Sequence, residues 1–186
     1  MLRRHSLDRN IQEEAIMKMT SACANKMLKK LNEDKEFWRN QEQSGYLYTA
    51  AENEEPVIPE YDYARVSAEI AEIDTKICII KHAVNQANVC SQISVGEQIL
   101  SVDQILVKMA QLNNRKAMLD NMRKKAPKRR LVTALFGHKS PAPEYEYINY
   151  DLELVKADYE RIDSEITEMQ MALDKYNQTV EFEVEI

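Results

Sequence analysis

The residues with the clearest chemical character form a basic run in the second half of the chain. Six of the eight residues from 123 to 130 are lysine or arginine, although the whole chain has a formal net charge of −6. Such a cluster is typical of a surface that contacts phosphate groups, because each contact releases a counterion. The candidate contacts for an anion or a nucleic acid are Arg123, Lys124, Lys125, Lys128, Arg129, Arg130 and Lys139.

A second interpretation explains the cations without a ligand. Residues 129–136 and 144–150 are two β-prone runs joined by a loop that contains glycine and proline, which predicts a β-hairpin at about 129–150. Its first strand would place cations beside the acidic residues from Glu146 to Asp151. Opposite charges across a strand pair contribute only ~0.2–1 kcal/mol each, but they neutralise one another. This interpretation is favoured, because it accounts for both kinds of charge.

The remaining residues offer little chemistry for catalysis. The three histidines (His5, His82 and His138) are scattered, and no metal-binding pair or phosphate-binding glycine loop is present. We therefore predict no catalytic residue, no cofactor and no metal site, and we favour a role other than catalysis. Three asparagines near helix ends form a candidate polar cluster, with helix capping as the simpler explanation: Asn85, Asn88 and Asn177.

The elements that would position these residues are mainly helices. Two segments repeat apolar residues at alternating steps of three and four, which forms one seam along a helix. These seams predict helices at about 61–87 and 149–180. The seam residues are Tyr63, Val66, Ile70, Ile73, Ile77, Ile80 and Val84 in the first, and Leu152, Val155, Tyr159, Ile162, Ile166, Met169, Leu173, Tyr176 and Val180 in the second.

Weaker patterns predict helices at about 7–39 and 101–125, the latter ending before Pro127 and interrupted in its seam by Lys116. The expected fold is mainly α: an elongated antiparallel bundle of about four heptad-patterned, coiled-coil-like helices, with the hairpin before the last helix. That last helix would be ~45 Å long, whereas a compact chain of this length has a radius of gyration of only ~16 Å. Residues 17–186 would form one domain and residues 1–16 an N-terminal extension. A thin bundle leaves apolar surface uncovered, so we expect a homo-oligomer.

Cysteine usage and hydropathy indicate the compartment. No run approaches the 18 apolar residues of a membrane span, and the N-terminus has no apolar stretch of a secretion signal. Three cysteines without CxxC spacing favour reduced thiols and a cytoplasmic location. On helices such thiols are expected to be small core residues.

Several short motifs occur in a characteristic order. They are Asn53-Glu54-Glu55-Pro56, then Asn85 to Asn88, leucines at 106, 112 and 119, the basic segment, Tyr150-Asp151-Leu152, and finally Asn177, Glu181 and Phe182. In this order the chain resembles the septicolysin-like family of small, mostly uncharacterised bacterial helical proteins, from about Met17 to the end. It departs from the family at residues 1–16 and at Gln178, where an aromatic residue is usual. The resemblance implies a mainly helical fold and oligomerisation, and it carries over no catalytic residue.

These observations predict a cytoplasmic, self-associating helical protein with an interaction or scaffold role. The alternative is nucleic-acid binding through residues 123–139. A further alternative, taken from the name of the septicolysin-like family, is membrane lysis.

Overall fold

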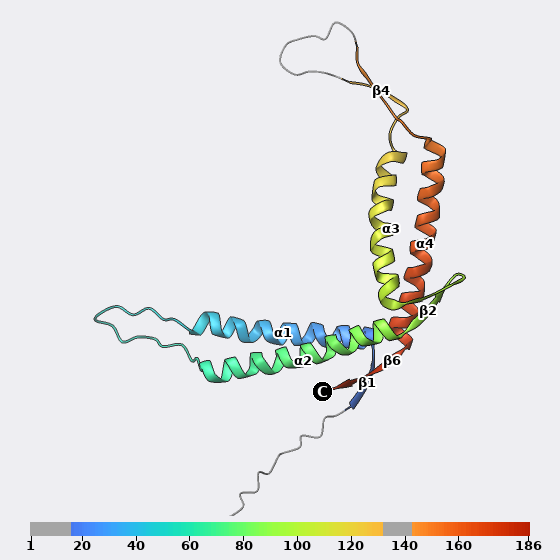
Figure 1. Ribbon diagram of the computed structural model, residues 1–186. Helices are drawn as coiled ribbons and strands as arrows, with labels where there is room; N and C mark the ends of the chain where they lie inside the picture. Colours follow the sequence, from blue (N-terminus) through green and yellow to red (C-terminus); the bar gives the residue numbers. More distant parts are fainter. Residues whose placement is uncertain (1–15, 132–142) are drawn as a thin grey trace, which may run out of the picture. The chain divides into compact units, whose positions relative to one another are not determined.

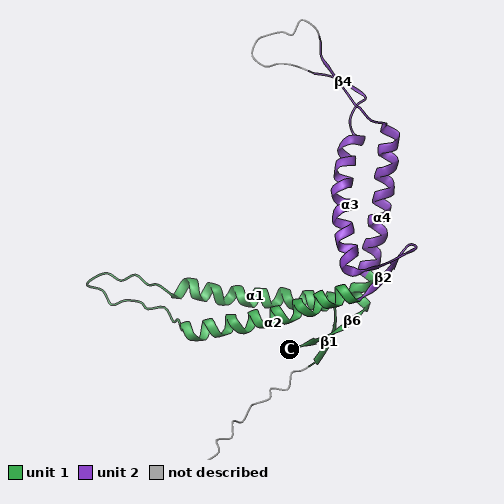
Figure 2. Cartoon of the chain, viewed as in Figure 1, with its two compact units in different colours: residues 1–90, 175–186 green, residues 91–174 purple. Residues whose placement is uncertain are grey.

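The computed structural model describes residues 16–131 and 143–186, and the fold in these residues is mainly helical, as the seams predict. The chain divides into two compact units, coloured separately in Figure 2. Unit 1 comprises residues 1–90 and 175–186, and unit 2 comprises residues 91–174. Each unit contains one helix pair, and the single four-helix bundle stays a prediction.

Unit 1 is built around two helices that lie side by side, α1 (Ser21–Gly45) and α2 (Tyr63–Cys90) (Figure 1). Helix α2 buries Val66, Ile73 and Ile80, three seam positions spaced seven apart. The seam residues between them are only half-buried. One partner helix covers a narrow stripe of a helix surface, so half of the seam keeps contact with solvent.

An antiparallel strand pair completes unit 1. Strand β1 (Ile16–Thr20) pairs with β6 (Glu181–Glu185), with Met19 opposite Phe182. Met19 and Val184 from the two strands join Ala24 of α1 and Ile80 of α2 in one buried cluster. The strands therefore contribute half of the buried residues in this core.

The prediction of a helix at 7–39 is wrong at residues 16–20, which form β1; residues 7–15 lie outside the described residues. The helix begins at Ser21, where the Thr20 hydroxyl caps it by accepting a hydrogen bond of 3.2 Å from the backbone N–H of Cys23. It continues to Gly45 rather than ending at 39. The start was missed because strand β6, at the other end of the chain, supplies the hydrogen bonds that hold residues 16–20 extended. Ile16 also pairs with Glu185, so the predicted extension 1–16 includes one residue of the fold.

Unit 2 begins with a hairpin that the sequence analysis did not predict. Strand β2 (Gln92–Val95) pairs with β3 (Gln98–Ser101), and Gly96 in the turn has a φ of 56°. A positive φ at the first turn residue is required by the two-residue turns that suit the twist of paired strands. The signal that was missed is a glycine, Gly96, between two short β-prone runs.

Helices α3 (Val102–Arg123) and α4 (Leu152–Thr179) follow the predicted boundaries to within three residues. The Gln104 side chain caps α3 by accepting a hydrogen bond of 3.0 Å from the backbone N–H of Ser101. Leu119 of α3 packs with Val155 and Ile162 of α4 in a buried cluster.

Ion pairs between lysines and carboxylates join the two helices of each pair, and between α3 and α4 they include Lys108 with Glu165 at 2.7 Å. Lys116 of α3 forms an ion pair with Asp163 of α4, and Lys35 of α1 binds Asp74 of α2 at 2.6 Å. The ion pair with Asp163 explains how Lys116 can occupy a position in an apolar seam, because its charge has a partner there. Charged pairs between two packed helices favour one register of the helices over its neighbours.

The predicted hairpin before the last helix is present in the described residues as β4 (Lys128–Arg130) paired antiparallel with β5 (Tyr145–Tyr147). Residues 132–142 of that prediction lie outside the described part of the chain.

Two further expectations concern the cysteines and the membrane. Cys23, Cys78 and Cys90 are all unpaired, as predicted, but they are exposed rather than in the core. Among the described residues, no helix combines the length and the apolar character that crossing a membrane requires.

Candidate interaction surfaces

The first two residues of the basic segment form ion pairs with a single carboxylate. The Arg123 guanidinium lies 2.7 Å from Asp120 Oδ1, and Lys124 forms an ion pair with the other carboxylate oxygen. The Arg123 guanidinium carbon is also 4.0 Å from the centre of the Tyr159 ring, which favours a cation. Hydrogen bonds from Lys124 and Arg123 hold the pKa of Asp120 below its ordinary value. The charges of Arg123 and Lys124, two of the predicted contact residues, are thus paired with a carboxylate within unit 2.

The hairpin provides partners for two more cations. Arg129 lies opposite Glu146 and forms an ion pair with it at 2.9 Å. The Lys128 ammonium lies 4.2 Å from the centre of the Tyr145 ring and 5.4 Å from that of Tyr147. The interpretation of the basic run as the cationic side of a hairpin therefore agrees with the structure at these positions.

Two cations remain. Lys125 and Arg130 are exposed, and neither forms an ion pair with any described residue. Lys139, the seventh candidate, lies outside the described residues. The charge available to an external anion is therefore smaller than the sequence indicates.

A pocket of about 370 Å³ lies between the end of α3, the hairpin strands and the residues that follow them. Its lining is mainly apolar and includes Met118, Met122, Tyr147, Ile148 and Tyr150. Lys125 and Arg129 lie among the lining residues as well, with Glu146 as the single acidic group. We call this the hairpin pocket; it is a mainly apolar hollow whose lining includes two cations and one carboxylate.

Two hydrogen bonds involve residues that line or adjoin the hairpin pocket. The Tyr150 hydroxyl donates to the backbone oxygen of Met122 at 2.7 Å, and the Ile148 N–H donates to the oxygen of Pro127 at 3.3 Å. The first bond ties the segment after β5 to α3, and the second joins the residues that flank the two strands of the hairpin. The sequence analysis named the cations of this region but did not anticipate the pocket.

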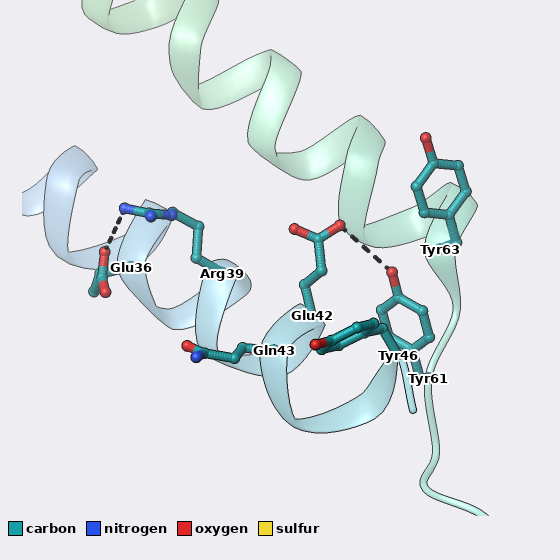
Figure 3. A pocket seen from close by; sticks show the side chains of 7 residues that line it. All are labelled: Glu36, Arg39, Glu42, Gln43, Tyr46, Tyr61 and Tyr63. Atoms are coloured by element: carbon teal, nitrogen blue, oxygen red, sulfur yellow. Dashed lines mark hydrogen bonds and ion pairs between the residues drawn. The ribbon is translucent and has the colours of Figure 1, made fainter. Parts of the chain in front are cut away.

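A second pocket, of about 610 Å³, lies in unit 1 where α1 ends and α2 begins (Figure 3). Its lining comes from α1 with the residue that follows it, and from the segment that leads into α2. The lining residues are Glu36, Arg39, Glu42, Gln43, Tyr46, Tyr61 and Tyr63. The Tyr61 hydroxyl donates to Glu42 at 3.5 Å. Partial burial, and then the charge and hydrogen bond of Glu42, raise the pKa of Tyr61.

Residues 46–62 connect the two helices of unit 1, and we call them the acidic loop. The loop contains five acidic residues and no basic one. Gly45 closes its base, because a Cβ at this position would lie only 2.6 Å from the Cβ of Tyr61. This close contact joins the two ends of the loop, and only glycine at position 45 leaves room for it.

The acidic loop and the adjoining helix ends expose a group of large apolar side chains. Seven of them are more than half exposed: Phe37, Tyr46, Leu47, Tyr48, Val57, Ile58 and Tyr63. Single exposed apolar residues are ordinary, whereas contiguous apolar patches are typical of interaction sites. The sequence signal was the density of aromatic residues around an acidic, proline-containing stretch.

The candidate polar cluster is not joined by hydrogen bonds. Asn85 is exposed, and Asn88 and Asn177 are half-buried, all three in unit 1. In the described residues no hydrogen bond connects their side chains, so the cluster stays a prediction. His82 is exposed on α2, and His5 and His138 lie outside the described ranges. No group of three or more histidine, cysteine or acidic residues that could hold a metal ion occurs in residues 16–131 and 143–186.

Comparisons with known proteins identify a fold but no activity. No protein-family model and no curated protein matches the chain. A solved structure from Corynebacterium diphtheriae, described as a functionally unknown conserved protein, is similar with a TM-score of 0.61 at 13% sequence identity. The similarity covers 89% of this chain and 99% of that one. The chain is thus similar in fold to a bacterial protein whose function is itself unknown.

Proposed function

We propose that this chain is a self-associating helical protein with an interaction or scaffold role. The observation that supports it best is the group of seven exposed apolar side chains around the acidic loop. Covering such a group removes apolar area from water, which stabilises an assembly by ~25 cal/mol per Å² before the costs of association.

The helix seams support the same proposal. On α2 only Val66, Ile73 and Ile80 are buried, and Ile70 and Ile77 between them remain half-buried. A helix whose seam is covered on one side retains an apolar edge that a further helix can occupy. The three unpaired cysteines are compatible with the reducing cytoplasm, which we propose as the location.

Sedimentation velocity over a wide range of protein concentration tests this proposal. We expect the sedimentation coefficient to rise with concentration towards that of a defined oligomer, and native mass spectrometry to give its copy number. A protein that remains monomeric at the highest concentration that stays in solution would refute self-association.

Nucleic-acid binding through residues 123–139 is the second candidate, favoured by the exposed Lys125 and Arg130. Four of the other candidate cations are already countered by Asp120, Glu146 or tyrosine rings. Fluorescence anisotropy with a labelled duplex and a labelled single strand tests it, since phosphate contacts predict affinity that falls steeply with salt. Affinity that is unaffected by reversing the charge of Lys125 and Arg130 would exclude them as the contacts.

The resemblance to the septicolysin-like family remains a proposal. Membrane lysis, which the family name suggests, predicts release of dye from liposomes, and intact vesicles would exclude it.

A further inference from the structure

Two surfaces of the chain are complementary in charge and in apolar character. The acidic loop has its most exposed apolar residue, Val57, at 89% exposure, and the neighbouring Ile58 at 63%. Carboxylates flank this pair on both sides, with Glu54 and Glu55 before it and Glu60 after it. The loop therefore presents an apolar centre between negative ends.

The hairpin pocket has the opposite arrangement. Its lining is mainly apolar, with methionine, tyrosine and isoleucine side chains, and it includes Lys125 and Arg129, the latter paired with Glu146. Arg130, on the strand that carries Arg129, adds an exposed cation with no ion pair to a described residue. Lys125, which lines the pocket, and Arg130, which follows Arg129 in β4 without lining the pocket, thus remain available to an acidic partner.

The backbone of the acidic loop favours docking. Pro56 and Pro59 bracket Val57 and Ile58. A proline restricts both its own φ and the conformation of the residue before it, so Glu55 and Ile58 are confined to extended conformations. An extended, proline-stiffened segment loses little conformational entropy when it enters an aromatic-lined groove, which is how proline-containing peptides are recognised. The close contact between Gly45 and Tyr61 further limits the freedom of the loop at its base.

We infer that the acidic loop of one copy docks into the hairpin pocket of a second copy, with Val57 and Ile58 in the apolar centre and Glu54, Glu55 and Glu60 facing Lys125 and the basic strand β4. This inference rests on the proposed self-association and identifies its surfaces. Because the two surfaces differ, the contact is heterologous, and repeated contacts build a closed ring or an open chain.

A mixing experiment with two variants of the full chain tests the inference. The loop variant V57D/I58D places charge in the apolar centre, and the pocket variant K125E/R130E repels the acidic loop. All four side chains are exposed, so we expect both variants to fold as the wild type does, which circular dichroism checks. A matched variant, K30E/K81E, reverses two exposed lysines of unit 1 that form no ion pair among the described residues, with the same change in net charge.

We expect each of the first two variants to weaken self-association by about tenfold or more, the loss typical of residues at the centre of an interface, and the matched variant to behave as the wild type. Mixed together, the loop variant supplies an intact pocket and the pocket variant an intact loop. Exactly one good contact can then form, so sedimentation velocity of the mixture gives a one-to-one dimer that grows no further.

The remaining outcomes separate the two proposals. If the wild type associates but the two variants associate equally well, the docking is refuted and self-association stands. If the variants are monomeric alone and stay monomeric when mixed, the pairing of loop with pocket is refuted. If the wild type itself is monomeric, both proposals fail.

Discussion

Replacing Gly45 with alanine tests the contact that closes the acidic loop. A Cβ at this position would lie 2.6 Å from the Cβ and 2.9 Å from the Cγ of Tyr61. Carbon atoms normally approach to about 3.5–4.0 Å, so the added methyl overlaps by about 1 Å. Forcing an extra methyl into a packed site costs ~1–3 kcal/mol.

An opposing term reduces this cost. Alanine is more favourable than glycine in a helix by about 0.5–1 kcal/mol, and Gly45 is the last residue of α1. We therefore expect Gly45→Ala to lower the free energy of unfolding by about 0.5–2 kcal/mol. Urea denaturation followed by circular dichroism measures this change in the free energy of unfolding. The control Gln43→Ala changes an exposed residue two positions earlier in the chain and is expected to stay within ~0.5 kcal/mol of the wild type.

A double-mutant cycle then separates the contact from helix propensity. In the Tyr61→Gly background the overlapping Cβ and ring are absent, so the same Gly45→Ala change becomes neutral or stabilising. A Gly45→Ala protein that is more stable than the wild type, with no coupling to Tyr61, would refute the close contact.

Three further predictions concern unit 2. Leu119→Ala removes a fully buried side chain and is expected to cost ~2–5 kcal/mol, whereas the exposed neighbouring Met118→Ala changes stability by less than ~0.5 kcal/mol; chemical denaturation compares them. Because the pKa of Asp120 is lowered on folding, its carboxylate stabilises the fold at any pH above the ordinary pKa of 3.8, and this stability is lost as the pH falls through the lower folded-state pKa. Asp120→Asn should therefore be less stable than the wild type at neutral pH, and thermal melts should show the difference closing in acid. A difference that stays constant with pH would contradict the linkage. Gly96→Ala forces a positive φ on a residue with a Cβ and should cost ~1–2 kcal/mol, with Gly96→Asn costing less, and equal melting temperatures for all three proteins would contradict it.

The helices were predictable because their signal is local. The seams of α2 and α4 repeat within each segment, and Ser101 with Gln104 marks the start of α3. Such patterns depend on residues within one or two turns of each other. They fix where a helix lies and which stripe must be covered, without reference to the partner that covers it.

The strands of unit 1 and the candidate surfaces depended on residues far apart in the chain. Residues 16–20 carry apolar positions that also fit a helix, and only the edge of Glu181–Glu185 makes them a strand. The basic run shows the same dependence in its charges. Its sequence shows six cations, but Asp120, Glu146, Tyr145 and Tyr159 decide which of them remain available.

The sequence by itself determined that this protein is mainly helical, that its helices carry one-sided apolar seams, and that a charged hairpin precedes the last helix. Periodicity, capping and strand alternation are properties of consecutive residues, so they can be read without coordinates. Only the tertiary structure decided that the acidic loop is closed by Gly45 and Tyr61, and that a mainly apolar pocket lies between the end of α3 and the hairpin strands. Both features arise where side chains from separate segments meet, and the distance between such side chains is set by packing rather than by their spacing in the sequence.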